Sequence, residues 1–460
     1  MYFLGIGGIG MSALARYFKS AGIAVSGYDK TPTSLTDALI AEGMKIHFEE
    51  NVNLLVSELR TPSSQLLIVY TPAVPASHSE LKYFRENNFN MIKRAELLGM
   101  LTQNHTTLAA AGTHGKTTTS SLIAHIFHHA GKSCTAFLGG IAKNFNSNLL
   151  LGKSAGKALS LGEGLGEAYM VVEADEYDRS FLHLHPDIAI VTSIDPDHLD
   201  IYGSREKMKE SYQQFVAQVK SGGALITKEN IELKASGRRI NYSTSGQADY
   251  YADNIRIVNH ENVFDIKWKG AEVKDVSSHM PGRHNIENTV AAFACAHLSG
   301  IETEVIKEAI KKFEGVVRRF DYRFRSKDMV YIDDYAHHPE ELRACIESVR
   351  ELYPQKKITG IFQPHLFSRT RDFADGFSKS LSLLDRLILL DIYPAREEPI
   401  PGVTSELIFK NVSIKDKVMM RKEEVIPALE KIEMEVLLTL GAGDIDTLVK
   451  PIAEMLKRKS

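Results

Sequence analysis

The sequence predicts an α/β protein of three domains, each built on a sheet of largely parallel strands. The chain has 460 residues, which is too long for one ordinary hydrophobic core. Short apolar strands alternate with helices in the first and last thirds of the chain, as a parallel sheet with covering helices requires. A glycine-rich turn between a strand and a helix occurs twice, at residues 5–10 and 112–119.

The composition excludes several classes of protein. Hydrophobic residues make up 43% and charged residues 25% of the chain, as in soluble globular proteins. A net charge of -3 gives no electrostatic reason to expect nucleic acid or an anionic membrane as a partner. No apolar run reaches the ~18 residues of a membrane span. Cys134, Cys295 and Cys345 lie far apart and form no CxxC, which favours a reducing, cytoplasmic location. We also expect the protein to be a monomer or a weak homodimer.

The first predicted domain covers residues 1–104 and is Rossmann-like, with strands at 2–4, 24–28 and 66–70 and helices at 10–21, 34–42, 79–87 and 94–101. Its first strand and helix are joined by a G-x-G-x-x-G turn, with Asp29 about 20 residues on. Such glycines let a diphosphate approach a helix N-terminus, without specifying a nicotinamide. We therefore predict a phosphate ligand there, the alternative being a tight turn with no ligand. The glycines concerned are Gly5, Gly7, Gly8 and Gly10.

The central predicted domain, residues 105–314, has a mixed sheet and is similar to P-loop ATPases. A strand at 107–111 leads into a turn that follows G-x-x-x-x-G-K-[ST], except that Ala110 takes the first glycine's place. Its backbone N–H groups can wrap a polyphosphate, Lys116 can reach the terminal phosphates, and the Thr117 hydroxyl can bind Mg²⁺. A helix follows from Lys116 to about Ala130. The predicted ATP-binding residues are Gly112, Thr113, His114, Gly115, Lys116, Thr117 and Thr118.

Two more strands of this domain, at 169–173 and 188–194, end in acidic residues or histidine. Ligands of open α/β sheets bind beyond the carboxyl ends of the strands. Glu173, at the start of an acidic run to Asp178, is the preferred Mg²⁺ ligand because Mg²⁺ favours carboxylate oxygens; an acidic surface loop is the alternative. His198 is a second candidate metal ligand or phosphate contact, or a structural histidine. A short antiparallel insert at 249–276 and a helix at 282–298 follow.

The third predicted domain, residues 315–460, is again Rossmann-like and doubly wound. Strands are expected at 329–332, 358–362, 386–391 and 436–440, and helices at 339–352, at 373–383 and from 441–444 onward. Asp334, Tyr335 and His337 follow its first strand. The paired arginines at 318–319 could close onto phosphates at the domain junction.

A cationic segment of the third domain suits a carboxylate. His365, Arg369 and Arg371 follow the strand at 358–362, and two arginines can pair with a carboxylate in bidentate fashion. A basic surface turn is the alternative.

Together these motifs resemble the Mur ligases over essentially the whole chain. The resemblance implies a three-domain ligase that depends on ATP and Mg²⁺. Its first domain would hold a UDP-sugar, and its third domain would bring the amino acid. The alanine-adding branch is the most similar, so the implied reaction joins L-alanine to the lactyl carboxylate of UDP-N-acetylmuramate through an acyl phosphate. The motifs are Gly5–Gly10, Gly112–Thr119, Glu173–Asp178, Asp197–Asp200, Gly282–Asn288, Arg318–Phe320, Asp334–Pro339, His365–Asp372 and Pro399–Val403.

The resemblance also implies roles for single residues. ATP would be contacted by Asn285, Arg319 and Asp334 as well, and metal would be held by Thr117, Glu173 and His198. The amino acid would be approached by Tyr335, His337, His365, Arg369 and Arg371, and the sugar nucleotide by Asp29, Thr71 and the first glycines. The catalytic group would comprise Lys116, His198, His337, Arg369 and Arg371, with His198 or His337 as the base for the alanine ammonium.

Three other functions stay open at this point. A recycling ligase that attaches a murein tripeptide to UDP-N-acetylmuramate would need a larger pocket and would not need the arrangement of Arg369 and Arg371. A nicotinamide oxidoreductase would use residues 5–10 and Asp29 but leave the central loop idle. A P-loop switch or binding protein would bind ATP without any dependence on a UDP-sugar.

Overall fold

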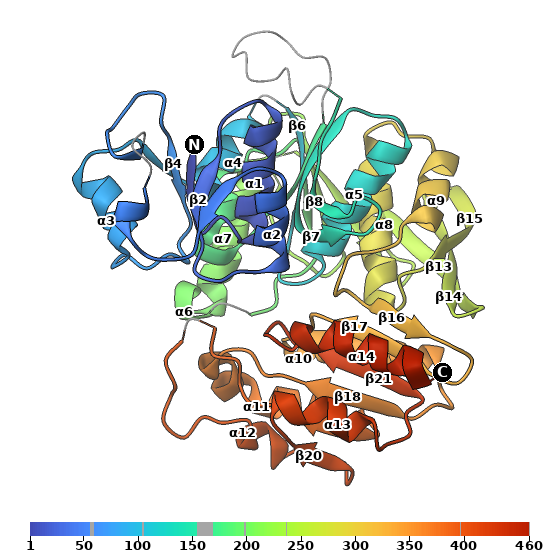
Figure 1. Ribbon diagram of the computed structural model, residues 1–460. Helices are drawn as coiled ribbons and strands as arrows, with labels where there is room; N and C mark the ends of the chain where they lie inside the picture. Colours follow the sequence, from blue (N-terminus) through green and yellow to red (C-terminus); the bar gives the residue numbers. More distant parts are fainter. Residues whose placement is uncertain are drawn as a thin grey trace. The chain divides into compact units, whose positions relative to one another are not determined.

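The computed structural model describes residues 1–55, 59–103, 105–153, 169–196, 199–235, 237–395 and 397–459 (Figure 1). Within these ranges the strands form three sheets of five, ten and six strands. The chain divides into two compact units, which we describe separately. The first contains residues 1–253, 265–276 and 287–313, and the second contains residues 254–264, 277–286 and 314–460. None of the described helices combines the length and the apolar character needed to cross a membrane.

The first sheet is parallel throughout, in the order β3-β2-β1-β4-β5, as a Rossmann-like domain requires. Tyr2 and Leu4 pack with α3 on one face, while Phe3 packs with α1 on the other, so helices cover both faces. The two strands that we did not predict, β3 and β5, have three residues each and give no apolar run. The elements are β1 (Tyr2–Leu4), α1 (Ile9–Ser20), β2 (Ser26–Tyr28), α2 (Ser34–Ala41), β3 (Lys45–His47), η1 (Val52–Leu54), β4 (Ile68–Tyr70), α3 (Ser79–Glu86), β5 (Met91–Lys93) and α4 (Arg94–Thr102).

The second sheet is mixed, in the order β15-β14-β13-β12-β11-β10-β6-β9-β7-β8. The strand pairs from β12 to β7 are parallel, and β7 and β8 are antiparallel, which confirms the predicted mixed sheet. Its strands are β6 (Thr106–Ala111), β7 (Cys134–Ala142), β8 (Ser147–Leu150), β9 (Tyr169–Glu173), β10 (Ile188–Val191), β11 (Ala224–Lys228), β12 (Arg238–Ser243), β13 (Tyr250–Val258), β14 (Glu261–Trp268) and β15 (Ala271–Ser278). Its helices are α5 (Lys116–His129), η3 (Tyr177–His183), α6 (Leu199–Tyr202), α7 (Arg205–Ala217), α8 (Arg283–Leu298) and α9 (Thr303–Lys312).

The insert predicted at 249–276 consists of β13, β14 and β15, joined by two-residue turns. Asn259 and His260 have φ values of 52° and 64°, and Lys269 and Gly270 have 34° and 76°. Positive φ at both central residues is typical of the tight turns of β-hairpins, which join antiparallel strands.

One hydrophobic core runs from the first sheet into the second. Phe3 of β1 and Leu14 of α1 belong to the same buried cluster as Ala109 of β6 and Val172 of β9. A polar tie reinforces this packing: the buried Asn148 of β8 donates a hydrogen bond of 2.6 Å to the carbonyl oxygen of Ile9. Helix α1 therefore packs against both sheets.

A buried histidine on α5 makes the stability of the first unit depend on pH. His125 is 6% exposed, and its Nε2 lies 3.0 Å from the Ala309 carbonyl oxygen, so Nε2 carries the hydrogen. Its Nδ1 is buried with no hydrogen-bond partner among the described residues. Burial therefore lowers the pKa of His125 to about 4.

We expect this histidine to destabilise the fold at acid pH. From pH 6.5 down to 4, the unfolded chain binds a proton that the folded chain does not, so the free energy of unfolding falls by about 3 kcal/mol. Above pH 6.5 the imidazole is neutral in both the folded and the unfolded chain, so none of this free energy of unfolding is lost. Urea unfolding of His125→Gln between pH 4 and 8 should lack this part of the pH dependence. His185→Gln, at an exposed position, is the control; an unchanged slope in His125→Gln would contradict the assignment.

The third sheet lies in the second unit, in the order β16-β17-β21-β18-β19-β20, with β16 antiparallel to β17 and the other pairs parallel. Helices α10, α11 and α12 pack on one face, and α13 and α14 pack on the other, which confirms the doubly wound prediction (Figure 1). The elements are β16 (Asp321–Arg325), β17 (Val330–Asp334), α10 (Pro339–Leu352), β18 (Ile358–Phe362), α11 (Phe367–Leu381), β19 (Arg386–Leu389), α12 (Glu406–Phe409), β20 (Lys417–Met419), η4 (Lys422–Glu424), α13 (Val425–Leu429), β21 (Val436–Leu440) and α14 (Asp446–Lys459).

The predicted start of the helix at residue 373 was wrong. Helix α11 begins at Phe367, and residue 373 is a kink with φ -121° and ψ 17°. The polar first turn, Ser368 to Arg371, lacks the apolar period on which the prediction relied, although Arg369 and Thr370 are buried.

Candidate functional site

The phosphate loop, residues 110–119, joins the carboxyl end of β6 to α5. Its sharp turns need glycine, because Gly112 has φ +133° and Gly115, the N-cap of α5, has φ +84°. The segment after β10 holds the loop in shape: Thr113 N–H donates to the Ser193 carbonyl oxygen at 3.2 Å, and the Thr113 hydroxyl donates to the Asp195 carbonyl oxygen at 2.7 Å. Ala110, in place of the first glycine, lies buried in β6 and leaves this path intact.

Lys116 is folded back into the phosphate loop. Its ammonium donates to the Gly112 carbonyl oxygen at 2.6 Å and to the Glu176 carboxylate at 2.9 Å. Burial alone would lower the pKa of Lys116, but the carboxylates of Glu176, Glu173 and Asp175 outweigh it and raise the pKa. Lys116 is therefore a charged ammonium that these contacts hold within the phosphate loop.

Glu173 and Thr117 offer oxygen atoms beside this cation. Glu173 ends β9 in register with Ala110 of β6, and its carboxylate is among those that raise the pKa of Lys116. Gly139 N–H donates to Glu173 Oε2 at 3.1 Å, and Thr117 is 6% exposed. A carboxylate and a hydroxyl fit Mg²⁺, which prefers hard oxygen ligands. The third predicted ligand, His198, lies outside the described residues, within which no three His, Cys, Asp or Glu side chains cluster as a metal site.

The first glycine loop, residues 5–10, is braced by the two side chains predicted to join it. Asp29 accepts a hydrogen bond of 2.7 Å from Gly7 N–H. Thr71 lies so close to Gly5 that a Cβ there would be 2.8 Å from the threonine methyl group. Gly8, the N-cap of α1, accepts a hydrogen bond of 2.8 Å from Ser12 N–H. The loop, Asp29 and Thr71 thus form one structure at the N-terminus of α1.

At the last of these glycines the loop meets an arginine that we did not predict. A Cβ added to Gly10 would lie 2.8 Å from Arg94 Nη1. No motif marks this arginine in the sequence.

In the second unit, the aromatic and histidine candidates come together at the carboxyl ends of β17 and β18. The rings of Tyr335 and His337 have centroids 5.2 Å apart, and those of His337 and His365 are 6.0 Å apart. His337 Nδ1 lies 3.2 Å from Glu341, and the Arg319 guanidinium lies 5.0 Å from the Tyr335 ring centroid.

Asp334 anchors the chain beneath this cluster. Its carboxylate accepts hydrogen bonds of 2.7 Å from the N–H groups of Phe320 and Ala336. Burial raises the pKa of Asp334 to about 6, against the opposing effect of Arg319. Asp334 therefore fixes the backbone that carries Tyr335 and His337.

The remaining predicted residues of the second unit differ in exposure. Arg369 is 7% exposed, whereas Arg371 has an exposed side chain that pairs with Asp372 at 2.7 Å. Asn285 is buried and donates to the Pro281 carbonyl oxygen at 2.7 Å. Arg318 donates to Asp333 at 3.1 Å and to the Gly441 carbonyl oxygen at 2.6 Å, which gives it a structural position.

Sequence reasoning missed three further residues of these sites. Glu176, the partner of Lys116, stood inside the acidic run, but Glu173 was preferred because it lies nearer the strand. Asn288 lies against Gly115, where a Cβ would be 2.5 Å from its Oδ1; in the sequence it is only the last residue of the motif Gly282–Asn288. Arg94 offered no signal, since its partners are distant in sequence.

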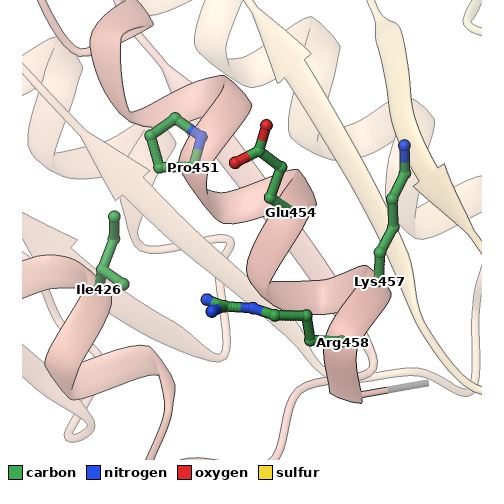
Figure 2. Close-up of a pocket in the computed structure, with 5 residues that line it drawn as sticks. All are labelled: Ile426, Pro451, Glu454, Lys457 and Arg458. Carbon is green, nitrogen blue, oxygen red and sulfur yellow. The ribbon is translucent and has the colours of Figure 1, made fainter.

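Three surface hollows of the described structure are lined by residues other than these. One hollow of about 410 Å³ lies over α13 and α14 and is lined by Ile426, Pro451, Glu454, Lys457 and Arg458 (Figure 2). A second hollow, of about 380 Å³, is lined by residues of β12, β13, β14 and the end of α8. A third, of about 420 Å³, is lined by residues between the end of α8 and the start of α9. Among the described residues, none of those that line these three hollows is a predicted site residue.

Comparison with known proteins covers nearly all of the chain. Three family profiles match in succession: "Mur ligase family, catalytic domain" over residues 1–106, "Mur ligase middle domain" over 110–296, and "Mur ligase, glutamate ligase domain" over 318–445. The UDP-N-acetylmuramate–L-alanine ligase of Phocaeicola vulgatus is 49% identical over 463 residues, covering 100% of this chain and 98% of the relative. That of Parabacteroides distasonis is 50% identical over 460 residues, covering 99% and 97%.

Solved structures agree with these matches. The UDP-N-acetylmuramate–alanine ligase of Thermotoga maritima has a TM-score of 0.83 and 26% identity, covering 100% of this chain and 99% of its own. A murein peptide ligase of Psychrobacter arcticus has the same fold, with a TM-score of 0.70, 20% identity and 98% coverage of both chains. The profiles, the full-length relatives and the fold lead to one conclusion: the chain belongs to the Mur ligase family.

Proposed function

We propose that the protein joins L-alanine to the lactyl carboxylate of UDP-N-acetylmuramate, with conversion of ATP to ADP and phosphate. The main support is the identity of 49–50%, over essentially the full chain, with relatives named as ligases of this sugar nucleotide and L-alanine. The phosphate loop, with Lys116 held by Gly112 and Glu176, would supply the ATP site that such a reaction needs. The murein peptide ligase, by contrast, shares only 20% of its sequence with this chain.

The chemistry follows from the weakness of a carboxylate as an acyl donor. A carboxylate oxygen attacks the γ-phosphorus of ATP, the bond to ADP breaks, and an acyl phosphate forms. The neutral amine of alanine then attacks the acyl carbon, and phosphate leaves with the former carboxylate oxygen. Lys116 and the loop N–H groups would stabilise the charge on the transferring phosphoryl group. The protein needs no nucleophile of its own; it supplies position and charge.

We further propose that Thr117 and Glu173 bind the Mg²⁺ that accompanies ATP, with His198 as a third ligand. Bound there, Mg²⁺ would neutralise phosphate charge. Two observations support this: Thr117 directly follows Lys116, and the Glu173 carboxylate acts electrostatically on Lys116. The metal dependence of phosphate release checks this: Glu173→Gln should need more Mg²⁺ for half-maximal rate.

We assign the sugar nucleotide to the first glycine loop with Asp29 and Thr71, which already form one structure around the N-terminus of α1. The amino acid is assigned to Tyr335, His337, His365, Arg369 and Arg371, and further ATP contacts to Asn285, Arg319 and Asp334. His337, with Glu341 at 3.2 Å, is placed to take up a proton, so we propose His337 or His198 as the base for the alanine ammonium.

We also propose the domain boundaries 1–104, 105–314 and 315–460, a cytoplasmic location, and a monomer or weak homodimer. The location is supported by Cys134, Cys295 and Cys345, all of which are buried free thiols.

The test is phosphate release from ATP with UDP-N-acetylmuramate and a panel of amino acids and peptides. We expect release only when the sugar nucleotide is present, and the highest kcat/KM with L-alanine. Release without the sugar nucleotide would exclude the ligase function. A preference for a murein tripeptide over L-alanine would identify the recycling reaction instead.

A further inference from the structure

Arg94, the first residue of α4, connects the two loops that the proposed reaction uses. Its Nη1 lies against Gly10 of the first glycine loop, where even a methyl group would crowd it. Its Nη2 lies 3.3 Å from Asp175 Oδ2 and 3.5 Å from Ser180 Oγ. Asp175 belongs to the acidic loop, residues 173–178. One guanidinium therefore spans from the start of α1 to the acidic loop beside the phosphate loop.

The connection is more than a surface ion pair. The Arg94 side chain is only 17% exposed, and α4 packs along η3, which continues the acidic loop. The preceding residue makes only an exposed ion pair, because Lys93 Nζ lies 3.2 Å from Asp178 with both side chains more than a third exposed. Asp178 and Arg179 have φ values of 52° and 53°, which are unfavourable for non-glycine residues and persist only when neighbouring contacts hold them.

The position of Asp175 gives this connection a consequence for chemistry. Asp175 lies two residues after Glu173, the proposed metal ligand, and directly before Glu176, which holds Lys116. Asp175 Oδ1 also accepts a hydrogen bond of 3.0 Å from Tyr177 N–H, so one carboxylate contacts both Arg94 and the backbone of its own loop. A shift of Asp175 would move both functional carboxylates.

We propose that Arg94 is a positioning residue for the ligase reaction, holding the acidic loop through Asp175 in a fixed place relative to the helix start that binds the sugar nucleotide. The inference rests on the proposed function. The loop that binds the acceptor and the loop that binds the metal and lysine are thereby kept in register. A misplacement of about 1 Å in such a site can cost about 10²-fold in rate.

A double-mutant cycle tests this assignment. Arg94→Met and Asp175→Asn should each lower kcat by about 10- to 100-fold, because each breaks the same tie. The kcat of the double variant should lie within about threefold of the kcat of the slower single variant. The Asp175→Asn change retains a side-chain oxygen for Tyr177 N–H, so the loop keeps its local turn. The dissociation constant of UDP-N-acetylmuramate, measured by calorimetry without ATP, should stay within about threefold of wild type.

Several results would overturn the proposal. Losses that multiply in the double variant would show that Arg94 and Asp175 act separately. A dissociation constant for UDP-N-acetylmuramate raised well beyond threefold would show that Arg94 binds the sugar nucleotide itself. A lower melting temperature with unchanged kcat would show a purely structural role. If Arg94→Met does not fold, Arg94→Lys replaces it in the cycle.

Two controls keep this test separate from the proposed function. Lys93→Met breaks the neighbouring, more exposed pair with Asp178 and should change kcat by no more than about twofold. Wild-type protein is assayed alongside for phosphate release with UDP-N-acetylmuramate and L-alanine. Inactive wild-type protein would refute the ligase function, whereas active wild-type protein with independent effects at Arg94 and Asp175 would refute only the role of Arg94.

Discussion

Replacing Lys116 with methionine is expected to lower the rate of phosphate release by at least about 10³-fold, because the loss removes a largely shielded cation held by the Gly112 carbonyl oxygen and the Glu176 carboxylate. Binding of UDP-N-acetylmuramate, measured by calorimetry without ATP, should be unchanged, since the first glycine loop is a separate structure. Loss of both properties would show that the two loops are not independent sites.

The control for this variant follows from the partner of the lysine. Glu176 is buried, and removing Lys116 leaves its carboxylate without the ammonium, which is strongly destabilising for a buried pair. The double variant Lys116→Met, Glu176→Gln removes that charge as well. We expect it to recover part of the melting temperature that the single variant loses but none of the activity. Recovery of activity would mean that Lys116 acts only through the stability of the loop.

Replacing Gly112 with alanine is expected to weaken ATP binding strongly. The residue has φ +133°, which side chains other than glycine rarely adopt, and a Cβ there would overlap the Thr192 hydroxyl and lie 2.8 Å from Ser193 N. Thr192 and Ser193 are part of the chain that holds the loop, so they cannot move aside without changing its shape. We expect ATP affinity to fall by about 100-fold or more, a loss of about 3 kcal/mol, in a fluorescent-nucleotide titration.

Gly131→Ala is the matched control for the backbone effect. Gly131 directly follows Ala130, the C-cap of α5, and has φ +71°, but a Cβ there would meet no atom of the described structure within 4 Å. This variant should lose about 1 kcal/mol of stability through backbone strain and keep its ATP affinity. If both alanine variants bound ATP equally well, the shape of the phosphate loop would not depend on Gly112.

The parts of the protein that could be predicted from sequence are those specified locally. The phosphate loop and the strand and helix that it joins lie within some 25 residues, β6 to α5. The glycines, lysine and threonine of the loop occupy positions that follow from that strand–turn–helix geometry. The first glycine loop is similar, because Asp29 follows the next strand of a parallel sheet. Strands β3 and β5 escaped prediction since three partly polar residues carry no periodic signal.

The contacts that could not be predicted join distant segments. Arg94 meets Asp175 across 81 residues of chain, and Lys116 meets Glu176 across 60. The sequence shows Glu173 and Glu176 as two acidic residues of one short segment and does not reveal which of them contacts Lys116. Only the fold decides that Glu176 faces the lysine while Glu173 lies beside β6. Burial also changes chemistry that sequence alone assigns as ordinary, as in the raised pKa of Asp334.

The packing of α1 has a consequence for how the chain can be divided. Because this helix shares one core with β1 and with β6 to β9, a fragment ending near residue 104 would expose the face that Phe137 and Leu149 normally cover. It would also leave the Ile9 carbonyl oxygen and the Ser12 hydroxyl of α1 without the Asn148 amide that donates to both. The first sheet with its glycine loop is therefore not an autonomous folding unit. A chimera that exchanges the acceptor-binding part of this enzyme has to exchange its contact strands, β7 and β8, together with it.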